Sequence, residues 1–286
     1  MKIIRTKLDM IEYGAQQKDR GASIGFVPTM GALHEGHLSL IREAVKGNTV
    51  VIASVFVNPT QFNNPDDFAK YPRTEEEDLK KLAAEGVDAV FMPTPEEIYP
   101  ANDQNKVKEY SLGSVAEVME GKYRPGHFQG VARILDILFR LVRPDRAYFG
   151  EKDFQQIAVV RNMIQSEGIN VEIVACPIKR DEDGLALSSR NELLTPELRK
   201  IAPEIYKTLK YSAEYSKEHS IQATKDTVIE RLDSVPGLKV EYFEIVDART
   251  LTPVDEWEES SWIVGCITVY CGEVRLIDNI TYRIPS

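Results

Sequence analysis

Cysteine is scarce in this chain of 286 residues, which contains only Cys176, Cys266 and Cys271. An odd number of cysteines without a Cys-x-x-Cys pair argues against both a disulfide framework and a zinc site. Long hydrophobic runs are missing as well, since no segment approaches the ~20 apolar residues of a membrane-spanning helix. Residues 1–9, MKIIRTKLD, contain no uninterrupted apolar core. We therefore expect a cytoplasmic protein that carries no signal peptide and has no membrane partner.

A surplus of positive charge is also absent. The chain has 35 Lys and Arg residues against 45 Asp and Glu residues, and its formal net charge is −10. This balance argues against a nucleic-acid partner, which would require a basic surface patch, and against docking on an anionic membrane. With 43% hydrophobic and 28% charged residues, the composition is that of a globular protein with one large domain or two ordinary ones.

Histidine is rare, yet two of the four histidines, His34 and His37, lie three residues apart. They belong to the segment PTMGALHEGH at 28–37, which follows an apolar run at 23–27 and precedes helically spaced apolar residues at 38–45. This order predicts a strand-to-helix turn. A helix N-terminus carries free N–H groups and roughly half a unit of positive charge, which suits a phosphate group that both histidines can face.

Two glycines in this turn, Gly31 and Gly36, permit a tight backbone and a close approach to a ligand. Their spacing resembles a P-loop, but His37 replaces the lysine of that motif and Leu38 replaces its magnesium-binding hydroxyl. A P-loop is therefore a poor interpretation. The His-x-Gly-His form instead resembles the signature of the nucleotidylyl-transferase superfamily. The plain alternative is a glycine turn with two incidental surface histidines.

Apolar runs alternate with helical patterns over the first part of the chain. The expected strands lie at 23–27, 49–57, 88–92, 146–149 and 170–175. The expected helices lie at 7–18, 38–45, 75–85, 127–142 and 153–166. This alternation predicts an α/β fold, a Rossmann-like parallel sheet flanked by helices. Ligands of such sheets bind at the carboxyl ends of the strands.

The pattern changes after Pro177. Thr195 is typical of an N-cap and Pro196 of a first helical position. Helices are expected at 196–217 and 221–233, followed by strands at 239–246, 262–270 and 274–282, with a hairpin loop at 271–273. We therefore predict a smaller C-terminal α+β domain with an antiparallel sheet. The predicted domains are 1–178 and 179–286, the second acting as a lid, with 179–190 as a mobile segment.

Polar residues follow several of the expected strands. Gln61, in an Asn-Pro turn, offers a donor and an acceptor for a hydroxyl or carboxylate group, although such a turn alone is ordinary. Lys152 can neutralise phosphate, Asp153 can cap a helix or bind ribose, and Gln156 is expected on the same helix face as Lys152. A capped surface helix explains that segment equally well.

Two further segments carry polar groups of the same kind. Residues 183–191 contain Ser188, Ser189 and Arg190, which suit phosphate oxygens. The turn at 121–129 contains Arg124 and His127, which could bind a substrate or simply be solvated.

Six motifs together resemble the pantothenate synthetase (pantoate–β-alanine ligase) family, over residues 22–194 and again at RLIDN, 275–279. They are PTMGALHEGH at 28–37, NPTQF at 58–62, YPRT at 71–74, RPGHF at 124–128, GEKDFQQ at 150–156 and DGLALSSRN at 183–191. The resemblance implies that pantoate attacks the α-phosphate of ATP to give pantoyl-adenylate and pyrophosphate. The β-alanine amine then displaces AMP and yields pantothenate, a coenzyme A precursor.

The resemblance also implies roles for individual residues. The implied ATP-binding residues are Met30, Gly31, Ala32, Leu33, His34, Glu35, Gly36, His37, Gly150, Glu151, Lys152, Asp153, Lys179, Leu187, Ser188, Ser189 and Arg190. His34, His37 and Lys152 would be catalytic, with His37 as proton donor. Gln61 and Gln156 would hold pantoate, and Gln61 would border the β-alanine site. Mg²⁺ would travel on the ATP phosphates without a protein metal site, and a homodimer through the N-terminal domain is implied.

Two departures and three alternatives accompany this resemblance. Glu77-Asp78 stands where the family often has aspartates, which leaves a metal-linked role open, and Lys179 replaces a commonly apolar residue at the edge of the adenine pocket.

The alternatives are a nucleotidyltransferase that releases a stable nucleotide, an RNA-binding protein related to aminoacyl-tRNA synthetases, and a non-catalytic nucleotide-binding regulator. Physically, adenylation requires positioning, donors aimed at phosphate and exclusion of water.

Overall fold

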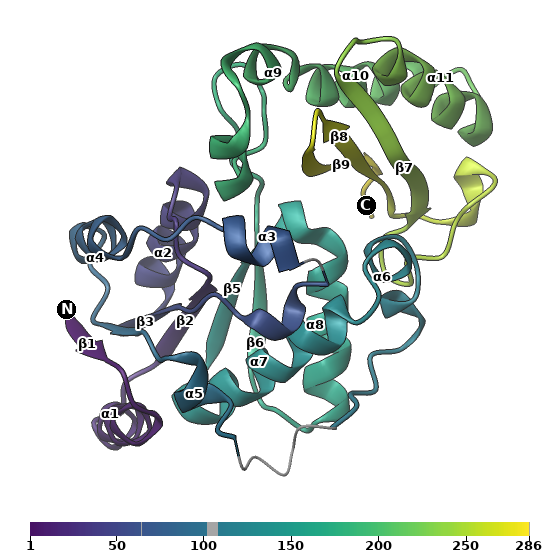
Figure 1. The fold of residues 1–286 in the computed structure, drawn as a ribbon. Helices are drawn as coiled ribbons and strands as arrows, with labels where there is room; N and C mark the ends of the chain where they lie inside the picture. Colours follow the sequence, from purple (N-terminus) through teal and green to yellow (C-terminus); the bar gives the residue numbers. More distant parts are fainter. Residues whose placement is uncertain (64, 102–107, 286) are drawn as a thin grey trace. The chain divides into compact units, whose positions relative to one another are not determined.

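The computed structural model describes residues 1–63, 65–101 and 108–285. Internal contacts divide the chain into two compact units (Figure 1). Unit 1 comprises Met1–Glu151 and Gln156–Pro177, and unit 2 comprises Lys152–Gln155 and Ile178–Ser286. The main division follows Pro177, where the composition changes, but the short segment Lys152–Gln155 packs with unit 2.

Unit 1 is built on one six-stranded sheet in the order β1-β4-β3-β2-β5-β6, and all its strand pairs are parallel. The strands are β1 (Lys2–Ile4), β2 (Ile24–Thr29), β3 (Val50–Val55), β4 (Ala89–Phe91), β5 (Arg146–Gly150) and β6 (Glu172–Cys176). All are confirmed from the apolar runs except β1. In this edge strand only Ile4 is buried, so its sequence contains no continuous apolar run.

Helices connect these strands and lie on both faces of the sheet (Figure 1). They are α1 (Lys7–Asp19), α2 (Glu35–Gly47), α3 (Pro65–Lys70), α4 (Glu75–Ala84), α5 (Pro95–Ile98), α6 (Glu120–Tyr123), α7 (His127–Val142) and α8 (Phe154–Ser166). The periodicity of 127–142 predicts α7 well because its apolar face is wide and buried. The expected α/β class is confirmed.

The centre of the unit 1 sheet is buried on both faces. All residues of β2 and β3 are buried except Pro28 and Val55, which are partly buried, and their apolar side chains pack against α2 and α4. A parallel sheet covered by helices has such continuous apolar strands. The arrangement leaves the loops after the strands as the positions for polar chemistry.

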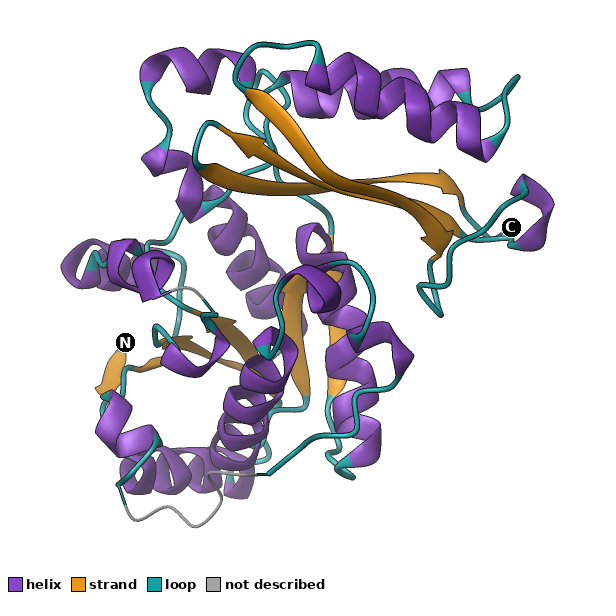
Figure 2. Ribbon diagram, turned by 45° about the vertical axis from the view of Figure 1, so that its right-hand side comes forward, coloured by secondary structure: helices purple, strands orange, loops and turns teal. Residues whose placement is uncertain are grey.

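Unit 2 is an antiparallel sheet covered on one face by helices (Figure 2). Its strands are β7 (Leu238–Asp247), β8 (Ile263–Cys271) and β9 (Val274–Arg283), and its helices are α9 (Pro196–Ile201), α10 (Glu204–Tyr215) and α11 (Ile221–Asp233). Thr195 caps α9 by accepting the Leu198 N–H at 3.3 Å. The single helix expected at 196–217 is wrong, because Pro203 cannot continue the hydrogen-bond ladder and separates α9 from α10.

The segment expected to be mobile, 179–190, begins as an ordered hairpin. Arg180 and Ala186 form a bridge, and the Leu187 N–H donates to the Lys179 carbonyl at 3.0 Å. The Arg180 guanidinium makes two bonds to Asp278 on β9, at 2.6 and 2.8 Å, and stacks on the Tyr206 ring. These contacts attach the start of the segment to β9 and α10 of unit 2.

Candidate active site

The strand order of unit 1 identifies the edge of the sheet where a ligand is expected. From β2 the chain passes outward to β3 and β4 on one side, and it later adds β5 and β6 on the other side. The order therefore reverses between β2 and β5. Open parallel sheets bind ligands at the carboxyl ends of strands at such a reversal. The segment 30–37 follows β2 and Gly150 ends β5, so the predicted phosphate-binding segments lie at this point.

His34 and His37 lie side by side at the N-terminus of α2. Their ring centroids are 4.1 Å apart, at an interplanar angle of 37°. His34 caps α2 because its Nδ1 accepts the Gly36 N–H at 3.1 Å, while His37 Nδ1 accepts the His34 N–H at 3.3 Å. Because both Nδ1 atoms accept, each neutral ring carries its proton on Nε2. The two imidazoles thus offer two N–H donors next to the positive end of a helix.

The turn before the histidines depends on Asp78 of α4. The Asp78 side chain is 1% exposed, and its oxygens accept the N–H groups of Ala32 at 2.9 Å and Leu33 at 2.8 Å. Gly31 and Ala32 have positive φ angles of 83° and 50°. A side chain at Gly31 would meet Asp78 Oδ2 at 3.0 Å. Two amides predicted to bind ATP phosphates are therefore bonded to a carboxylate, a partner that the sequence did not reveal.

Gln61 lies beside this turn and is held at both ends of its amide. Asn58 Nδ2 donates to Gln61 Oε1 at 3.0 Å, and Gln61 Nε2 lies 3.0 Å from Met30 Sδ. Asn58 itself is 1% exposed and also donates to the Gly130 carbonyl at 3.1 Å. The sequence indicated only a turn at Asn58, and its role in orienting Gln61 was missed.

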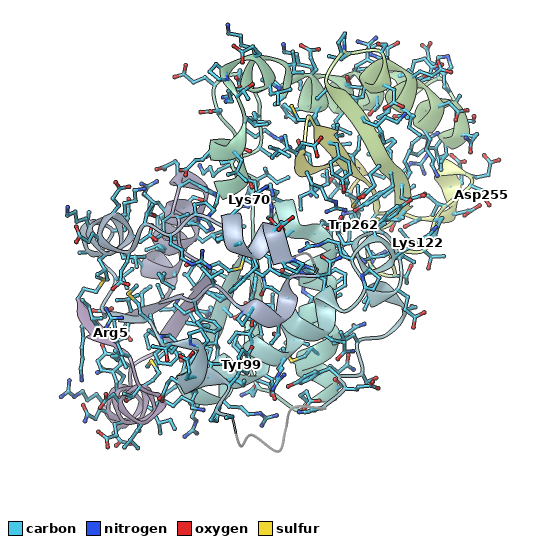
Figure 3. All side chains as sticks on the ribbon, viewed as in Figure 1. Arg5, Lys70, Tyr99, Lys122, Asp255 and Trp262 are labelled. Carbon is cyan, nitrogen blue, oxygen red and sulfur yellow. The ribbon has the colours of Figure 1, made fainter. Side chains whose placement is uncertain are left out.

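A second layer of side chains supports the Gln61 segment. His127 is buried at the start of α7, with Nδ1 at 2.8 Å from the Gln61 carbonyl oxygen and Nε2 at 3.2 Å from Arg124. Tyr99, labelled in Figure 3, donates its hydroxyl to Asn58 Oδ1 at 2.8 Å. Burial raises the pKa of Tyr99 to about 12, so this donor keeps its proton at neutral pH. His127 is thus a packed support rather than a solvated charge.

Other predicted residues of unit 1 have clear positions. Glu35 pairs with Arg42 on the exposed side of α2. Gly150 ends β5 and Glu151 follows it, while Gln156 lies partly buried in α8. The expectation that Lys152 shares a helix face with Gln156 is wrong, since Lys152 belongs to a 3₁₀ turn, Glu151–Asp153, ahead of α8. No glycine or proline in the sequence separates this turn from the helix.

Unit 2 contains the remaining predicted residues. Lys152 is anchored through its carbonyl, which accepts from Asn279 Nδ2 of β9 at 3.2 Å. Near Lys152, Phe154 packs edge-on against Trp262, which Figure 3 labels, with ring centroids 6.2 Å apart. Asp153 is exposed between these residues. The anchor at Asn279 was not predicted, although the RLIDN motif contains it.

The hairpin and the turn after it hold the other unit 2 residues. The Lys179 carbonyl is bonded within the hairpin, and the Lys179 side chain is exposed. Ser188 accepts the Arg190 N–H at 3.3 Å and begins a 3₁₀ turn at Ser189–Leu193. Ser189 is buried, whereas Leu187 and Arg190 are partly exposed. Two of the predicted phosphate-binding side chains, Ser188 and Arg190, are thus partly exposed, whereas the third, Ser189, is buried.

Neither a membrane span nor a metal cluster is found in the part of the chain that the structure describes. No helix there is both long and apolar enough to cross a bilayer. Within the same described residues, no group of three or more His, Cys, Asp and Glu side chains is arranged to hold a metal ion.

Known proteins resemble this chain over its whole length. The family described as Pantoate-beta-alanine ligase matches residues 2–281. A pantothenate synthetase from Porphyromonas gingivalis is 55% identical, over 99% of this chain and 100% of the relative.

Solved structures agree with the sequence relatives. A pantothenate synthetase structure from Thermus thermophilus has a TM-score of 0.91 and 42% identity, and it covers 99% of this chain and 100% of its own. A pantoate-beta-alanine ligase from Francisella tularensis, complexed with Beta-gamma ATP and Beta-alanine, has a TM-score of 0.82 and 35% identity, with 99% and 98% coverage. This chain therefore belongs to the pantoate–β-alanine ligase family, and it is a ligase.

Proposed function

We propose that this protein joins pantoate to β-alanine in two steps and releases AMP and pyrophosphate. The proposal is supported most directly by the two histidines whose rings lie side by side at the N-terminus of α2, at the reversal point of the sheet. Donors in this arrangement suit the α-phosphate of ATP. ATP would enter as its Mg²⁺ complex, so that the metal arrives with the substrate.

In the first step a pantoate carboxylate oxygen attacks the α-phosphorus, and the bond from that phosphorus to the pyrophosphate oxygen breaks. Negative charge grows on the phosphate oxygens, where His34 and His37 would donate their Nε2 protons as hydrogen bonds. Removal of one such donor from an enzyme costs about 3 kcal/mol of transition-state stabilisation. Gln61, oriented by Asn58, would hold the pantoate in line, and Gln156 would bind its other end.

In the second step the β-alanine amine attacks the acyl carbon of pantoyl-adenylate. The bond from that carbon to the phosphate oxygen breaks, AMP leaves, and the amine loses a proton to solvent. Acyl-adenylates hydrolyse readily, so the intermediate needs protection from water. We propose that residues 179–286 act as the lid that gives this protection, with residues 1–178 as the other domain.

The unit 2 residues would bind the nucleotide. Lys152 would neutralise phosphate, and Asp153 would accept from ribose hydroxyls. Ser188, Ser189 and Arg190 would donate to the triphosphate, with Leu187 beside them, and the backbone of Lys179 would border adenine. We also propose a homodimer in the cytoplasm. The homodimer is implied by the family resemblance, and the location by the cysteine content and the lack of an apolar signal-peptide core in the sequence.

The test is exchange of labelled pyrophosphate into ATP with pantoate present and β-alanine absent. Exchange that requires pantoate would support the adenylate step, and later addition of β-alanine should yield AMP and pantothenate in equal amounts. Exchange without pantoate, or none at all in protein that binds ATP, would refute the proposed reaction.

A further inference from the structure

We propose that Asp78 and Lys81 of α4 form a clamp that sets the conformation of the turn at Gly31–Leu33, and thereby positions His34 and His37. These two residues are positioning residues that need not touch the substrate. The kinetic part of this inference rests on the proposed function above, whereas its structural part does not.

The two side chains grip both polar backbone groups of Leu33. Asp78 Oδ1 accepts the Leu33 N–H at 2.8 Å, and Lys81 Nζ donates to the Leu33 carbonyl at 2.7 Å. Residues three apart in a helix share one face. Leu33, the residue directly before the His34 cap, is therefore bonded to one face of α4 twice. The Asp78 carboxylate binds its N–H, and the Lys81 ammonium group binds its carbonyl.

The clamp acts on a strained part of the backbone. Ala32 has a φ of 50°, a region that side-chain-bearing residues seldom occupy because of steric cost. The Asp78 carboxylate offsets this cost by accepting the Ala32 N–H at 2.9 Å in addition to that of Leu33. Hydrogen bonds to a charged acceptor are stronger than neutral ones. Without Asp78 the turn should relax, and the His34 cap should move with it.

The contacts of Asp78 also bear on a metal-linked role at this position. Both carboxylate oxygens accept backbone N–H groups, and Oδ1 also accepts the Thr74 hydroxyl at 3.2 Å. The side chain is 1% exposed. The Asp78 carboxylate is therefore bonded to the backbone of the turn and to Thr74. The neighbouring Glu77 side chain is exposed to solvent. The geometry thus assigns Asp78 to the turn rather than to the ATP-borne magnesium.

The test compares Asp78→Asn and Lys81→Met with two matched controls on the exposed side of α4, Glu77→Gln and Lys80→Met. In Asp78→Asn an amide N–H would face a backbone N–H. We expect kcat/KM for ATP to fall about 10- to 100-fold in Asp78→Asn and about 3- to 10-fold in Lys81→Met, with the KM for β-alanine unchanged. The controls should match the wild type.

A second readout is independent of activity. Hydrogen exchange of the segment 30–37 should become about tenfold faster or more in both clamp variants, at unchanged global stability in Lys81→Met. The clamp would be overturned if hydrogen exchange of the segment 30–37 were unchanged in both clamp variants and their kcat/KM for ATP matched that of the controls. A higher Mg²⁺ requirement with unchanged exchange would overturn it as well, because it would assign Asp78 to the metal. If the wild type lacks pantoate-dependent exchange of pyrophosphate, the proposed function fails while hydrogen exchange still decides on the clamp.

Discussion

Asn58 donates its side-chain amide to Oε1 of Gln61 at 3.0 Å, and this bond fixes which end of the Gln61 amide presents its N–H groups. The partner of Gln61 Nε2, Met30 Sδ, lies in the turn that leads to the histidines. The orientation of the Gln61 amide is thus set by a buried residue. A change at Asn58 should therefore act on the substrate through Gln61.

Asn58→Ala should lower kcat/KM for pantoate about 10- to 100-fold, because Gln61 loses its orienting donor. The measurement is pantoate-dependent pyrophosphate exchange, with Gln61→Ala as the reference for complete loss of the amide. Tyr99→Phe is the control, since it removes a donor to Asn58 but retains the bond from Asn58 to Gln61. A pantoate dependence unchanged in Asn58→Ala would contradict the orienting role.

His37→Ala should lower adenylation at least about a hundredfold with the fold intact, because one of the proposed donors to the phosphate disappears. Circular dichroism and the rate of pyrophosphate exchange give the two readouts. His219→Ala is a suitable control, as His219 is an exposed histidine of unit 2 whose ring lies stacked on Tyr215. A near-normal rate in His37→Ala would remove His37 from the chemistry.

Arg180→Met should destabilise unit 2 by about 3 kcal/mol, because it leaves the buried Asp278 carboxylate without its partner. Arg199 of α9 offers a contrast, since its ion pairs with Asp181 and Asp183 in the hairpin segment are much more exposed. Arg199→Met should cost only about 0–1 kcal/mol. Urea unfolding measures both variants, and equal effects would contradict the argument from burial.

The three cysteine thiols should resist alkylation in the native protein. All three are buried. Burial, with smaller effects of Glu43 and Glu151, raises the pKa of the Cys176 thiol to about 11, and burial also raises the pKa of Cys271. Only thiolate reacts, and at pH 8 a pKa of about 11 leaves roughly one thiolate in a thousand. Iodoacetamide should therefore label three thiols only after unfolding, and rapid native labelling would contradict this.

Most of the fold could be predicted because its strands and helices carry strong local patterns. The helix α7 and the strand β3 illustrate this, since a wide apolar face and a continuous apolar run each determine one structure. The break at Pro203 and the short strand β1 escaped prediction. The break comes from a local signal, Pro203, which the apolar periodicity on both sides of it masked. The strand β1 depends on its pairing with β4, which local periodicity does not encode.

The candidate site was only partly predictable for a related reason. His34, His37 and Gln61 belong to motifs, and the structure brings all three to neighbouring loops of unit 1. Asp78, by contrast, lies 45 residues beyond Leu33 in the sequence and acts on its backbone. A bond from a side chain to a distant amide leaves no trace in residue spacing. Supporting residues are therefore harder to predict than the residues they support.

The anchor between Asn279 and Lys152 has a consequence for the order of events during synthesis. Asn279 lies on β9, the strand made after all others, and pairs with Cys266 of β8. Domains begin to fold as they emerge from the ribosome, N-terminal parts first. Lys152 is translated early, yet it can acquire this anchor only when β9 has been added. A nascent chain should therefore complete its parallel sheet well before it becomes an active enzyme.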